Sequence, residues 1–388
     1  MTKPWPMVPL GEILAERKEV PFPTDIENGS IRIVSKIGFK EGKIELRSGA
    51  ETKTGMILIR PGDLVVSGIN AAKGAIAIYG EENTEPIAAT IHYGSYIPNK
   101  DRVDVKFLWW LLRSRTFRDL LLEYVPGGIK TELKAKRLLP VPIPLPRIAE
   151  QQRIVARIEE LAAKIEEAKG LRQKAVEEAE AFLASASDNA FKLRGGWDEA
   201  KIGDFCEQPQ YGYTASATSD QIGPRLLRIT DIQDGKVNWE TVPFCHCPTP
   251  KQYLLQNDDI VFARTGATTG KSFLIKEAPE AVFASYLIRL RVQKLATVDY
   301  LYRYFQTPSY WSQITDTKKG TGQPNVNGTK LANIRVPMAP PEEQRRIVAY
   351  LDDLQAKVDS LKRLQAGTAI ELNAMLPSVL DRAFKGEM

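Results

Sequence analysis

The sequence of 388 residues contains little cysteine and histidine and no long apolar run. Its longest apolar candidate, residues 107–112, falls far short of the roughly 20 residues that a membrane-spanning helix needs. The N-terminus has no apolar signal core, so we expect a cytoplasmic protein that does not enter a membrane. The sequence has only 3 cysteines, a number that is too small, and odd, for a disulfide framework.

Two of the cysteines flank a histidine, and this cluster has two interpretations. Cys245, His246 and Cys247 could ligate zinc, or the thiols could be small buried groups on a strand or loop. Adjacent ligands rarely surround one tetrahedral ion, and no second pair at zinc-finger spacing follows. We therefore predict buried thiols and no metal site.

Motifs of catalytic and nucleotide-binding sites are also missing. Residues 266–272 resemble a phosphate-binding loop, but three residues separate the glycines where the motif needs four. Asp25, Glu41 and Lys43 could surround a nuclease metal, but residues 41–43 have the pattern of a hairpin turn. No methyltransferase or metalloprotease signature is present either. We therefore predict a binding protein with no catalytic residue.

The chain does contain an internal repeat of about 190 residues. Residues 150–155 (EQQRIV) match residues 343–348 (EQRRIV) at an offset of 193. Residues 41–43 match residues 234–236 at the same offset. Since the chain is also longer than one compact core usually takes, the repeat predicts two similar domains.

Each copy begins with a globular part of mixed character. Residues 57–59, 64–66 and 75–79 are short apolar runs typical of strands. Residues 103–122 and their counterpart, residues 298–314, have the apolar faces of helical segments. The combination predicts a mixed α/β (α+β) globule in each copy.

Each copy ends in a long helical segment that starts after a proline-rich run. Apolar residues recur at alternating spacings of four and three, which is the heptad seam of a coiled coil. The pattern breaks at Arg172 and, 193 residues later, at Gln365, and it includes Phe182 and Met375. The predicted helix–helix seam consists mainly of Ile154, Ile158, Leu161 and Ile165 in the first copy and Ile347, Leu351, Leu354 and Val358 in the second.

Each long helix has about 40 residues and is therefore roughly 60 Å long. It could pack on its own globule, but a helix of this length outruns a single small domain. We predict that the two helices pair as an antiparallel coiled coil, with the two copies related by a pseudo-two-fold axis. The expected parts are globular domains at residues 1–146 and 191–341 and helices at residues 147–190 and 342–388.

The positive charge is concentrated on the globular parts. The net charge is +4 in residues 1–146 and in residues 191–341, but −2 and −1 in the two helical segments. A polyanion would therefore be held at two places. Candidate DNA contacts are Asn70, Lys73, Lys130, Lys134, Lys136 and Arg137 in the first copy and Arg264, Thr265, Lys271, Lys318, Lys319, Gln323, Asn325 and Asn327 in the second.

The repeat, the proline-rich run at residues 141–146 and the EQQRIV that follows it resemble the specificity subunits of type I restriction-modification enzymes. Residues 334–348 of the second copy resemble the family more closely still, as do residues 320–331. The resemblance covers the whole chain, although residues 127–136 depart from the family pattern.

This resemblance implies two target-recognition domains, each of which reads one half of a split, asymmetric double-stranded DNA site. It implies that the paired helices set the spacing between the half-sites and dock methyltransferase (M) subunits. Those subunits would bind S-adenosylmethionine, and a restriction/translocase (R) subunit would use ATP and Mg²⁺. The chain itself would bind no cofactor and no metal.

Two alternatives to this function stay open from the residues alone. The chain could be a coiled-coil scaffold that reads no DNA, which salt-sensitive preference for one duplex over scrambled competitors would exclude. It could also be a nuclease or ATPase with a degenerate site. Turnover by the purified chain, lost on changing Lys271 or Lys43, would support that function.

Overall fold

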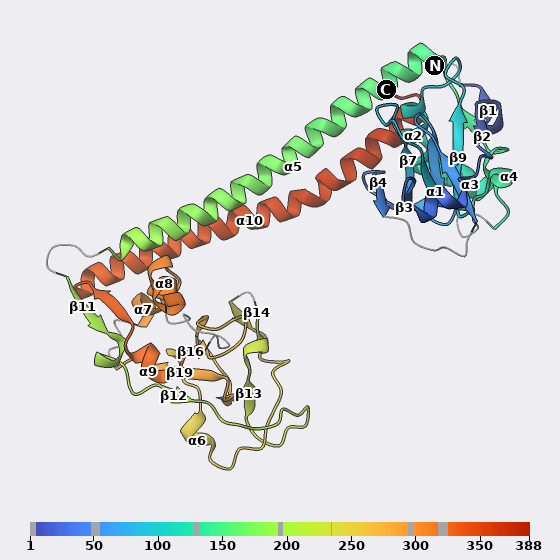
Figure 1. The fold of residues 1–388 in the computed structure, drawn as a ribbon. Helices are drawn as coiled ribbons and strands as arrows, with labels where there is room; N and C mark the ends of the chain where they lie inside the picture. Colours follow the sequence, from blue (N-terminus) through green and yellow to red (C-terminus); the bar gives the residue numbers. More distant parts are fainter. Residues whose placement is uncertain are drawn as a thin grey trace. The chain divides into compact units, whose positions relative to one another are not determined.

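The computed structural model describes residues 5–47, 55–127, 132–192, 197–233, 235–293, 298–316 and 325–388. The chain divides into two compact units (Figure 1). Unit 1 comprises Met1–Arg172 and Ala366–Met388, and unit 2 comprises Gln173–Gln365. Both divisions fall at the positions where the heptad pattern of the sequence is interrupted.

Unit 1 contains ten strands, β1 to β10, in the part of the chain that the structure describes. Two four-stranded sheets have the orders β2-β9-β6-β7 and β4-β3-β8-β5, and β1 pairs with β10. The strands are β1 Met7–Pro9, β2 Leu14–Glu16, β3 Arg32–Ile37, β4 Ile44–Arg47, β5 Met56–Ile59, β6 Leu64–Ser67, β7 Ile76–Ile78, β8 Ile87–Thr90, β9 Tyr93–Pro98 and β10 Pro142–Pro144. The helices are α1 Pro23–Glu27, α2 Val105–Leu112, α3 Arg115–Tyr124, α4 Ala135–Leu138 and the first part of α5 Ile148–Ala190, with a short 3-10 turn, η2, at Ala71–Lys73.

Unit 2 repeats this order with strands of two to five residues. One four-stranded sheet has the order β12-β19-β16-β17, and three strand pairs surround it. The strands are β11 Asp198–Lys201, β12 Gln210–Tyr211, β13 Arg225–Leu227, β14 Ile232–Gln233, β15 Lys236–Val237, β16 Asp259–Ala263, β17 Ser272–Leu274, β18 Ala281–Phe283, β19 Leu287–Arg291 and β20 Arg335–Met338. The helices are the last part of α5, α6 Pro250–Tyr253, α7 Val298–Tyr304, α8 Pro308–Asp316, α9 Gly328–Ala332 and the first part of α10 Pro341–Phe384.

The two units share their topology as well as their sequence pattern. The sheet order β2-β9-β6-β7 of unit 1 corresponds strand by strand to β12-β19-β16-β17 of unit 2. In both units an early strand pairs in parallel with a later one, β3 with β8 and β13 with β18. The strand before each long helix pairs with the first strand of its unit, β10 with β1 and β20 with β11. The predicted α/β repeat is confirmed.

Local sequence explains where the shorter helices begin and end. The Asp104 carboxylate accepts hydrogen bonds from Lys106 N and Phe107 N, which caps the start of α2. Ser114 then caps α3, so residues 103–122 form a helix pair. In unit 2, α8 begins at Pro308, which supplies the fixed φ suited to a first turn.

A buried glutamine ties the start of each long helix to the proline-rich run before it. Gln151 Nε2 donates to Pro146 O at 2.8 Å, and Gln344 Nε2 donates to Ala339 O at 2.8 Å. Both glutamines are at most 3% exposed, and 193 residues separate them. In unit 1 the other amide atom, Gln151 Oε1, also accepts from Asp104 N at 2.8 Å. These bonds explain why the glutamine recurs in the EQQRIV and EQRRIV motifs.

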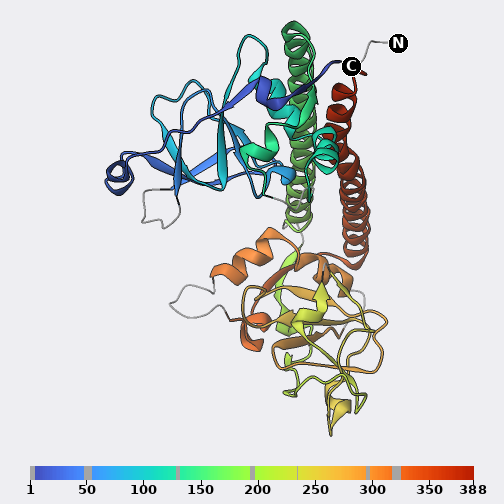
Figure 2. The same cartoon turned by 90° about the vertical axis from the view of Figure 1, so that its right-hand side faces the viewer.

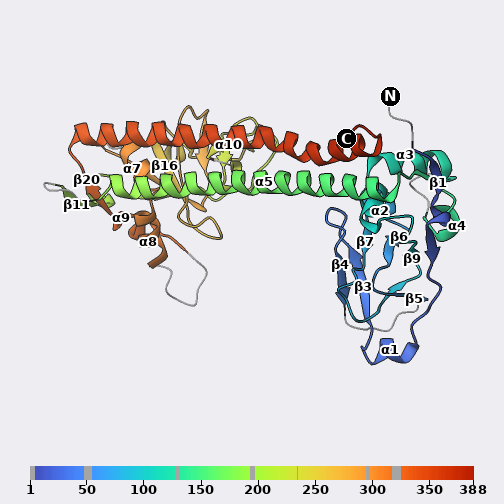
Figure 3. The ribbon, with the colours of Figure 1, turned by 90° about the horizontal axis from the view of Figure 1, so that it is seen from above.

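In unit 1 the start of α5 and the end of α10 pack on the globular core together. Ile154 and Ile158 belong to one buried cluster with Leu380, Ala383 and Phe384. The two helical segments run in opposite directions beside each other (Figure 2). Helix α2 lies between these helices and the sheet strands (Figure 3). In unit 1 the predicted seam residues therefore contact both the other helix and the globular core.

In unit 2 the end of α5 and the start of α10 likewise pack together on the globular core. Ile347 and Leu351, at the start of α10, share a buried cluster with Ala190 at the end of α5. Lys362 and Glu180 form an ion pair between the two helical segments. Of the other principal seam residues, Ile165 and Val358 are buried, while Leu161 and Leu354 are half-buried. The prediction was wrong at Phe182 and Met375, which are 59% and 48% exposed, because their side chains lie at the rims of surface grooves.

A polar contact replaces the apolar seam where the heptad pattern breaks in unit 1. Arg172 Nη1 donates to Thr368 Oγ1 at 2.7 Å, and both side chains belong to unit 1. Thr368 itself occupies a predicted seam position of the second copy. A polar pair in an apolar seam favours one register of two helices over others.

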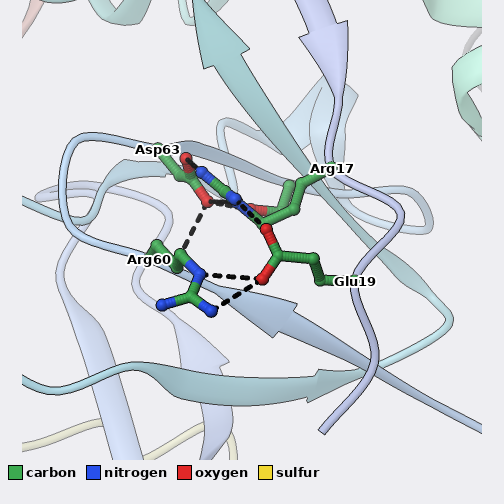
Figure 4. Close-up of polar contacts among 5 residues, drawn as sticks. Arg17, Glu19, Arg60 and Asp63 are labelled. Carbon is green, nitrogen blue, oxygen red and sulfur yellow. Dashed lines mark hydrogen bonds and ion pairs between the residues drawn. The ribbon is translucent and has the colours of Figure 1, made fainter.

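A buried aspartate at the start of one central strand of each unit, β6 or β16, forms an ion pair with an arginine. In unit 1 Asp63, just before β6, receives two bonds from Arg17, at 2.6 and 2.9 Å, and one from Ser95 Oγ at 2.7 Å. Figure 4 shows this group with Glu19, which in turn binds both Arg17 and Arg60. The hydrogen bond to Asp63 raises the pKa of Arg17.

Unit 2 places Asp259 at the equivalent position but supplies its cations from a different strand. Arg291 of β19 donates two bonds to Asp259, at 2.8 and 2.9 Å, and Arg289 lies 3.7 Å away. The hydrogen bond with Asp259 raises the pKa of Arg291, whereas burial lowers the pKa of Arg289. In both units the carboxylate also accepts from a backbone N–H three residues earlier, Arg60 N or Gln256 N.

Among the described residues no helix is long and apolar enough to cross a membrane. The described part of the chain also holds no group of three or more His, Cys, Asp and Glu side chains arranged to bind a metal ion. Cys245 and Cys247 are buried in a small apolar cluster with Leu226 and Val282. Burial raises the pKa of the Cys245 thiol.

Candidate nucleic-acid interface

Three distant segments of unit 2 meet beyond the end of β16. Arg264 N donates to Tyr286 O at 3.0 Å, and Val326 N donates to Arg264 O at 2.9 Å. Thr265 and Asn325 form an isolated antiparallel bridge beside this point. The structure thus brings together three residues that the sequence singled out as DNA contacts, Arg264, Thr265 and Asn325. We call this place the crossing point of unit 2.

Unit 1 has a crossing point with the same backbone hydrogen bonds. Gly68 N donates to His92 O at 2.7 Å, and Leu133 N donates to Gly68 O at 2.8 Å. By these bonds Gly68, His92 and Leu133 occupy the places of Arg264, Tyr286 and Val326 in unit 2. Only the backbone is shared, because the side chains differ at every one of these positions.

The guanidinium of Arg264 is held over an aromatic ring. Its central carbon lies 5.0 Å from the centre of the Tyr211 ring, within the range of a cation–π contact. The Tyr211 hydroxyl accepts a hydrogen bond from Gly328 N at 3.0 Å. Gly328 is the first residue of α9, which Asn327 caps by accepting from Lys330 N at 2.8 Å. The side-chain oxygen Oδ1 of the candidate residue Asn327 is therefore engaged in capping α9, whose first residue bonds the Tyr211 hydroxyl.

Unit 1 carries a different set of polar groups around its crossing point. His92 Nδ1 lies 2.9 Å from Glu132 Oε1, and Lys134 lies 3.6 Å from the same carboxylate. Arg137 Nη1 donates to Glu132 O at 3.1 Å. Hydrogen bonding by His92 and the charge of Lys134 lower the pKa of Glu132. Beside these groups, Ile69 is 58% exposed.

Replacing His92 with alanine is expected to raise the pKa of Glu132 toward that of a free carboxyl. The reason is that the strongest group lowering this pKa, the hydrogen bond from His92, is removed. A carboxyl-carbon NMR titration of both proteins measures the shift. Glu160 is the internal control, because Lys164 and Arg157 lower its pKa independently of His92. An unchanged Glu132 titration would show that His92 and Glu132 do not interact in solution.

The other candidate residues of unit 1 lie at two places. Asn70 stands two residues beyond Gly68 and precedes the short turn η2, and Lys136 is exposed on α4. Lys73 lies 5.9 Å from the centre of the Phe39 ring. It lines a hollow together with Arg113 and Arg118, which sequence reasoning missed.

In unit 2 Lys271 is exposed immediately before β17. Its backbone N–H donates to Thr268 O at 2.9 Å, so residues 266–271 form a turn that leads into the strand. Four candidates lie outside the described residues: Lys130, Lys318, Lys319 and Gln323.

Sequence reasoning also missed the aromatic and histidine residues of the two crossing points. His92 lies in the turn between β8 and β9. Tyr211 and Tyr286 were not singled out, although they are 40% and 64% exposed. No signal for this pair existed in the sequence, because the repeat offset of 193 aligns His92 with Ser285 and Tyr286 with Tyr93.

The family of the chain follows from comparison with known proteins. The family model described as the type I restriction modification DNA specificity domain matches residues 2–177 and again residues 194–368. The chain therefore belongs to the family of proteins built from this domain, and it contains the domain twice.

Individual relatives agree with this result. The chain is 22% identical over 354 residues to the type I restriction enzyme EcoKI specificity subunit of Escherichia coli (strain K12), covering 85% of this chain and 75% of that one. It is 20% identical over 354 residues to the StySPI specificity subunit of Salmonella potsdam, with the same coverage.

Solved structures are similar over the full length. A chain from a study of complex assembly and conformational transition in the type I R-M system has a TM-score of 0.79 and 25% identity, covering 100% of this chain and 99% of that chain. The crystal structure of the HsdS subunit from Thermoanaerobacter tengcongensis has a TM-score of 0.67 and 24% identity, covering 100% and 98%.

Proposed function

We propose that this chain is the DNA-sequence specificity subunit of a type I restriction-modification complex. Each unit reads one half of a bipartite, asymmetric site in double-stranded DNA. The observation that carries the proposal is the pair of crossing points, where one backbone arrangement presents two different sets of side chains. Two domains that share a backbone arrangement but differ in their side chains suit a DNA site whose two halves differ in sequence.

The proposed mechanism combines base contacts and phosphate contacts. The major groove displays a distinct donor and acceptor pattern for each base pair, so side chains at the crossing points supply the selectivity. Exposed cations beside them, such as Lys134 and Lys136 of unit 1 and Lys271 of unit 2, contact phosphates and fix the register on the duplex. This division of labour predicts strong salt dependence of binding.

The two long helices have a separate role in this proposal. They form an antiparallel coiled coil that relates the units by a pseudo-two-fold axis and sets the distance between the half-sites. The opposed pairs inside each unit, Arg172 with Thr368 and Glu180 with Lys362, support this arrangement. A separation of about one duplex turn, ~34 Å, would place both half-sites on one face of the DNA.

Partner subunits complete the activity. Methyltransferase subunits would dock on the helices, where Leu171 and Leu364 are 62% and 67% exposed at positions equivalent by the repeat. These partners would hold S-adenosylmethionine, and a restriction subunit would hold ATP and Mg²⁺. The present chain would act in the cytoplasm as a recognition subunit without a catalytic site.

Selection of DNA from a randomised duplex pool tests the function directly. The full-length chain should enrich two short motifs that differ in sequence and are separated by a fixed number of unspecified bases. Enrichment should fall steeply as salt rises, because cation–phosphate contacts release counterions. Equal retention of all sequences would contradict the proposal and favour the scaffold alternative.

An insertion of four residues into α5 after Gly170 tests the role of the helices. Four residues lengthen a helix by about 6 Å, close to one turn, so the unspecified spacer should change in length while both motifs persist. A matched control carries four residues after Thr84, in the turn between β7 and β8, and should keep the original spacer. If the helix insertion also left the spacer unchanged, the helices would not set the spacing.

A further inference from the structure

Arg264 differs in its surroundings from several other arginines of unit 2. Arg228, Arg291 and Arg303 each form an ion pair with an aspartate. Among the residues that the structure describes, Arg264 has no carboxylate partner, and its buried Nε has no hydrogen-bond acceptor. Buried donors without an acceptor are rare in folded proteins, so this arginine occupies a position that folding alone does not explain.

The position of Arg264 is nevertheless well fixed. Its backbone N–H and C=O both bond to other segments, Tyr286 O and Val326 N, so the base of the side chain is held from two sides. Tyr211 supports the guanidinium from below, and the Tyr211 hydroxyl is itself held by Gly328 N. The ring attracts the cation, and the planar guanidinium fork can donate two parallel hydrogen bonds to one acceptor group.

Among the described residues the Arg264 guanidinium has no carboxylate partner, and the Arg264 backbone is held from two sides. Such an arginine suits an acceptor group that takes two parallel hydrogen bonds. Arginine donates two parallel hydrogen bonds to O6 and N7 of guanine in the major groove, and this is the commonest specific contact between a protein and a base. The same fork also fits phosphate, so the two acceptors are distinguished by whether the contact depends on DNA sequence. Exposed neighbours that could flank a base include Tyr286, at 64% exposure, and Asn325.

The equivalent place in unit 1 is a glycine, so it presents no side chain. A Cβ atom on Gly68 would lie 3.0 Å from His92 O and 3.2 Å from Leu133 O, which are backbone atoms. A side chain here would require these backbone segments to shift by a few tenths of an ångström. Recognition by unit 1 must use the groups around the crossing point instead, chiefly His92, Glu132 and Ile69.

We infer that Arg264 is a specificity-determining residue that reads a guanine in the half-site of unit 2, with Tyr211 as its positioning residue. Unit 1 has no counterpart of this contact, so the two half-sites differ at the corresponding base. The inference rests on the proposed function and adds to it one named contact and one named base.

Selection from the randomised duplex pool with the wild-type full-length chain and with Arg264→Ala and Arg264→Lys tests the inference. Both variants should lose a guanine preference at one position of one motif, by about 5- to 150-fold, and keep all other positions. Arg264→Lys retains the charge but loses the planar fork, so its overall affinity and salt dependence should stay close to wild type while the guanine preference falls. Lys276→Ala, which removes a cation paired with Asp258, is the matched control and should select the wild-type motif.

Variants of Tyr211 provide a second readout that general damage to the fold would not reproduce. Tyr211→Ala should weaken the same guanine position as Arg264→Ala, and the double variant should add little. Tyr211→Phe keeps the ring but loses the bond to Gly328 N, so its effect should be smaller. Thermal unfolding of each variant separates loss of recognition from loss of folding.

The outcomes that overturn the inference are distinct from those that overturn the function. If Arg264→Ala weakens all sequences equally, Arg264 contacts phosphate and the base assignment is wrong. The assignment of guanine is also wrong if the variant loses a preference for another base, or if no base preference changes. A wild-type chain that enriches no motif at all would instead overturn the proposed function.

Discussion

Replacing Asp259 with alanine is expected to lower the free energy of unfolding of unit 2 by about 3–5 kcal/mol. Asp259 is 1% exposed and accepts hydrogen bonds from Arg291 and from Gln256 N. Its removal takes from the 6%-exposed Arg289 the strongest opposite charge acting on it, and leaves the Gln256 N–H without its acceptor. Breaking a buried ion pair from one side is costly because the remaining charge stays in a poorly solvated place.

Chemical denaturation followed by fluorescence and by hydrogen exchange measures this effect in each unit. Asp299→Ala is the matched control, because Asp299 is an exposed carboxylate 3.7 Å from Lys276, and it should stay within about 0.5 kcal/mol of wild type. Binding to the half-site of unit 2 should weaken as well, since β16 leads directly into Arg264. Equal stability of Asp259→Ala and the control would mean that the buried pair contributes nothing to the fold.

Truncating Ile158 or Leu351 to alanine should destabilise one unit in each case, by about 2–5 kcal/mol. These residues are equivalent by the repeat, are 0% and 1% exposed, and belong to the cores of unit 1 and unit 2 respectively. The loss combines the transfer energy of the removed carbons with the cavity that they leave. Hydrogen exchange resolved by peptide should show faster opening of unit 1 in Ile158→Ala and of unit 2 in Leu351→Ala.

An exposed apolar residue of the same helices supplies the control for these truncations. Ile370 of α10 is 75% exposed, so Ile370→Ala should change stability by no more than about 0.5 kcal/mol. A uniform effect of Ile158→Ala on the peptides of both units would contradict the assignment of Ile158 to the core of unit 1.

Much of the fold could be predicted from the sequence because the strongest patterns are local. The long helices at Ile148–Ala190 and Pro341–Phe384 follow from proline-rich entries and sustained apolar periodicity. The helix pair α2 and α3 follows from apolar faces and from a serine that can cap the second helix. The burial of Phe182 and Met375 was predicted wrongly, because a heptad pattern gives the face of a helix but not the point at which its partner ceases to cover it.

The candidate site was harder to predict, since it depends on contacts between distant segments. Nothing local in the sequence indicates that Arg264, Tyr286 and Asn325 meet, because strand pairing alone brings them together. Tyr211 acquires its role only through Gly328, which follows it by more than a hundred residues. Charge and amide content did select Arg264, Thr265 and Asn325, but could not separate Asn327, whose carbonyl oxygen caps a helix.

The division of the chain has a consequence for the order in which the protein is made. Unit 2 is one continuous stretch, Gln173–Gln365, whereas unit 1 needs Ala366–Met388 in addition to the first part of the chain. Leu380, Ala383 and Phe384 contribute to the apolar core of unit 1. On the ribosome, all residues of unit 2 are synthesised before the last segment of unit 1. The synthesis of unit 1 therefore begins first, but its fold is completed last. The apolar core surface of unit 1 stays exposed while unit 2 is being synthesised.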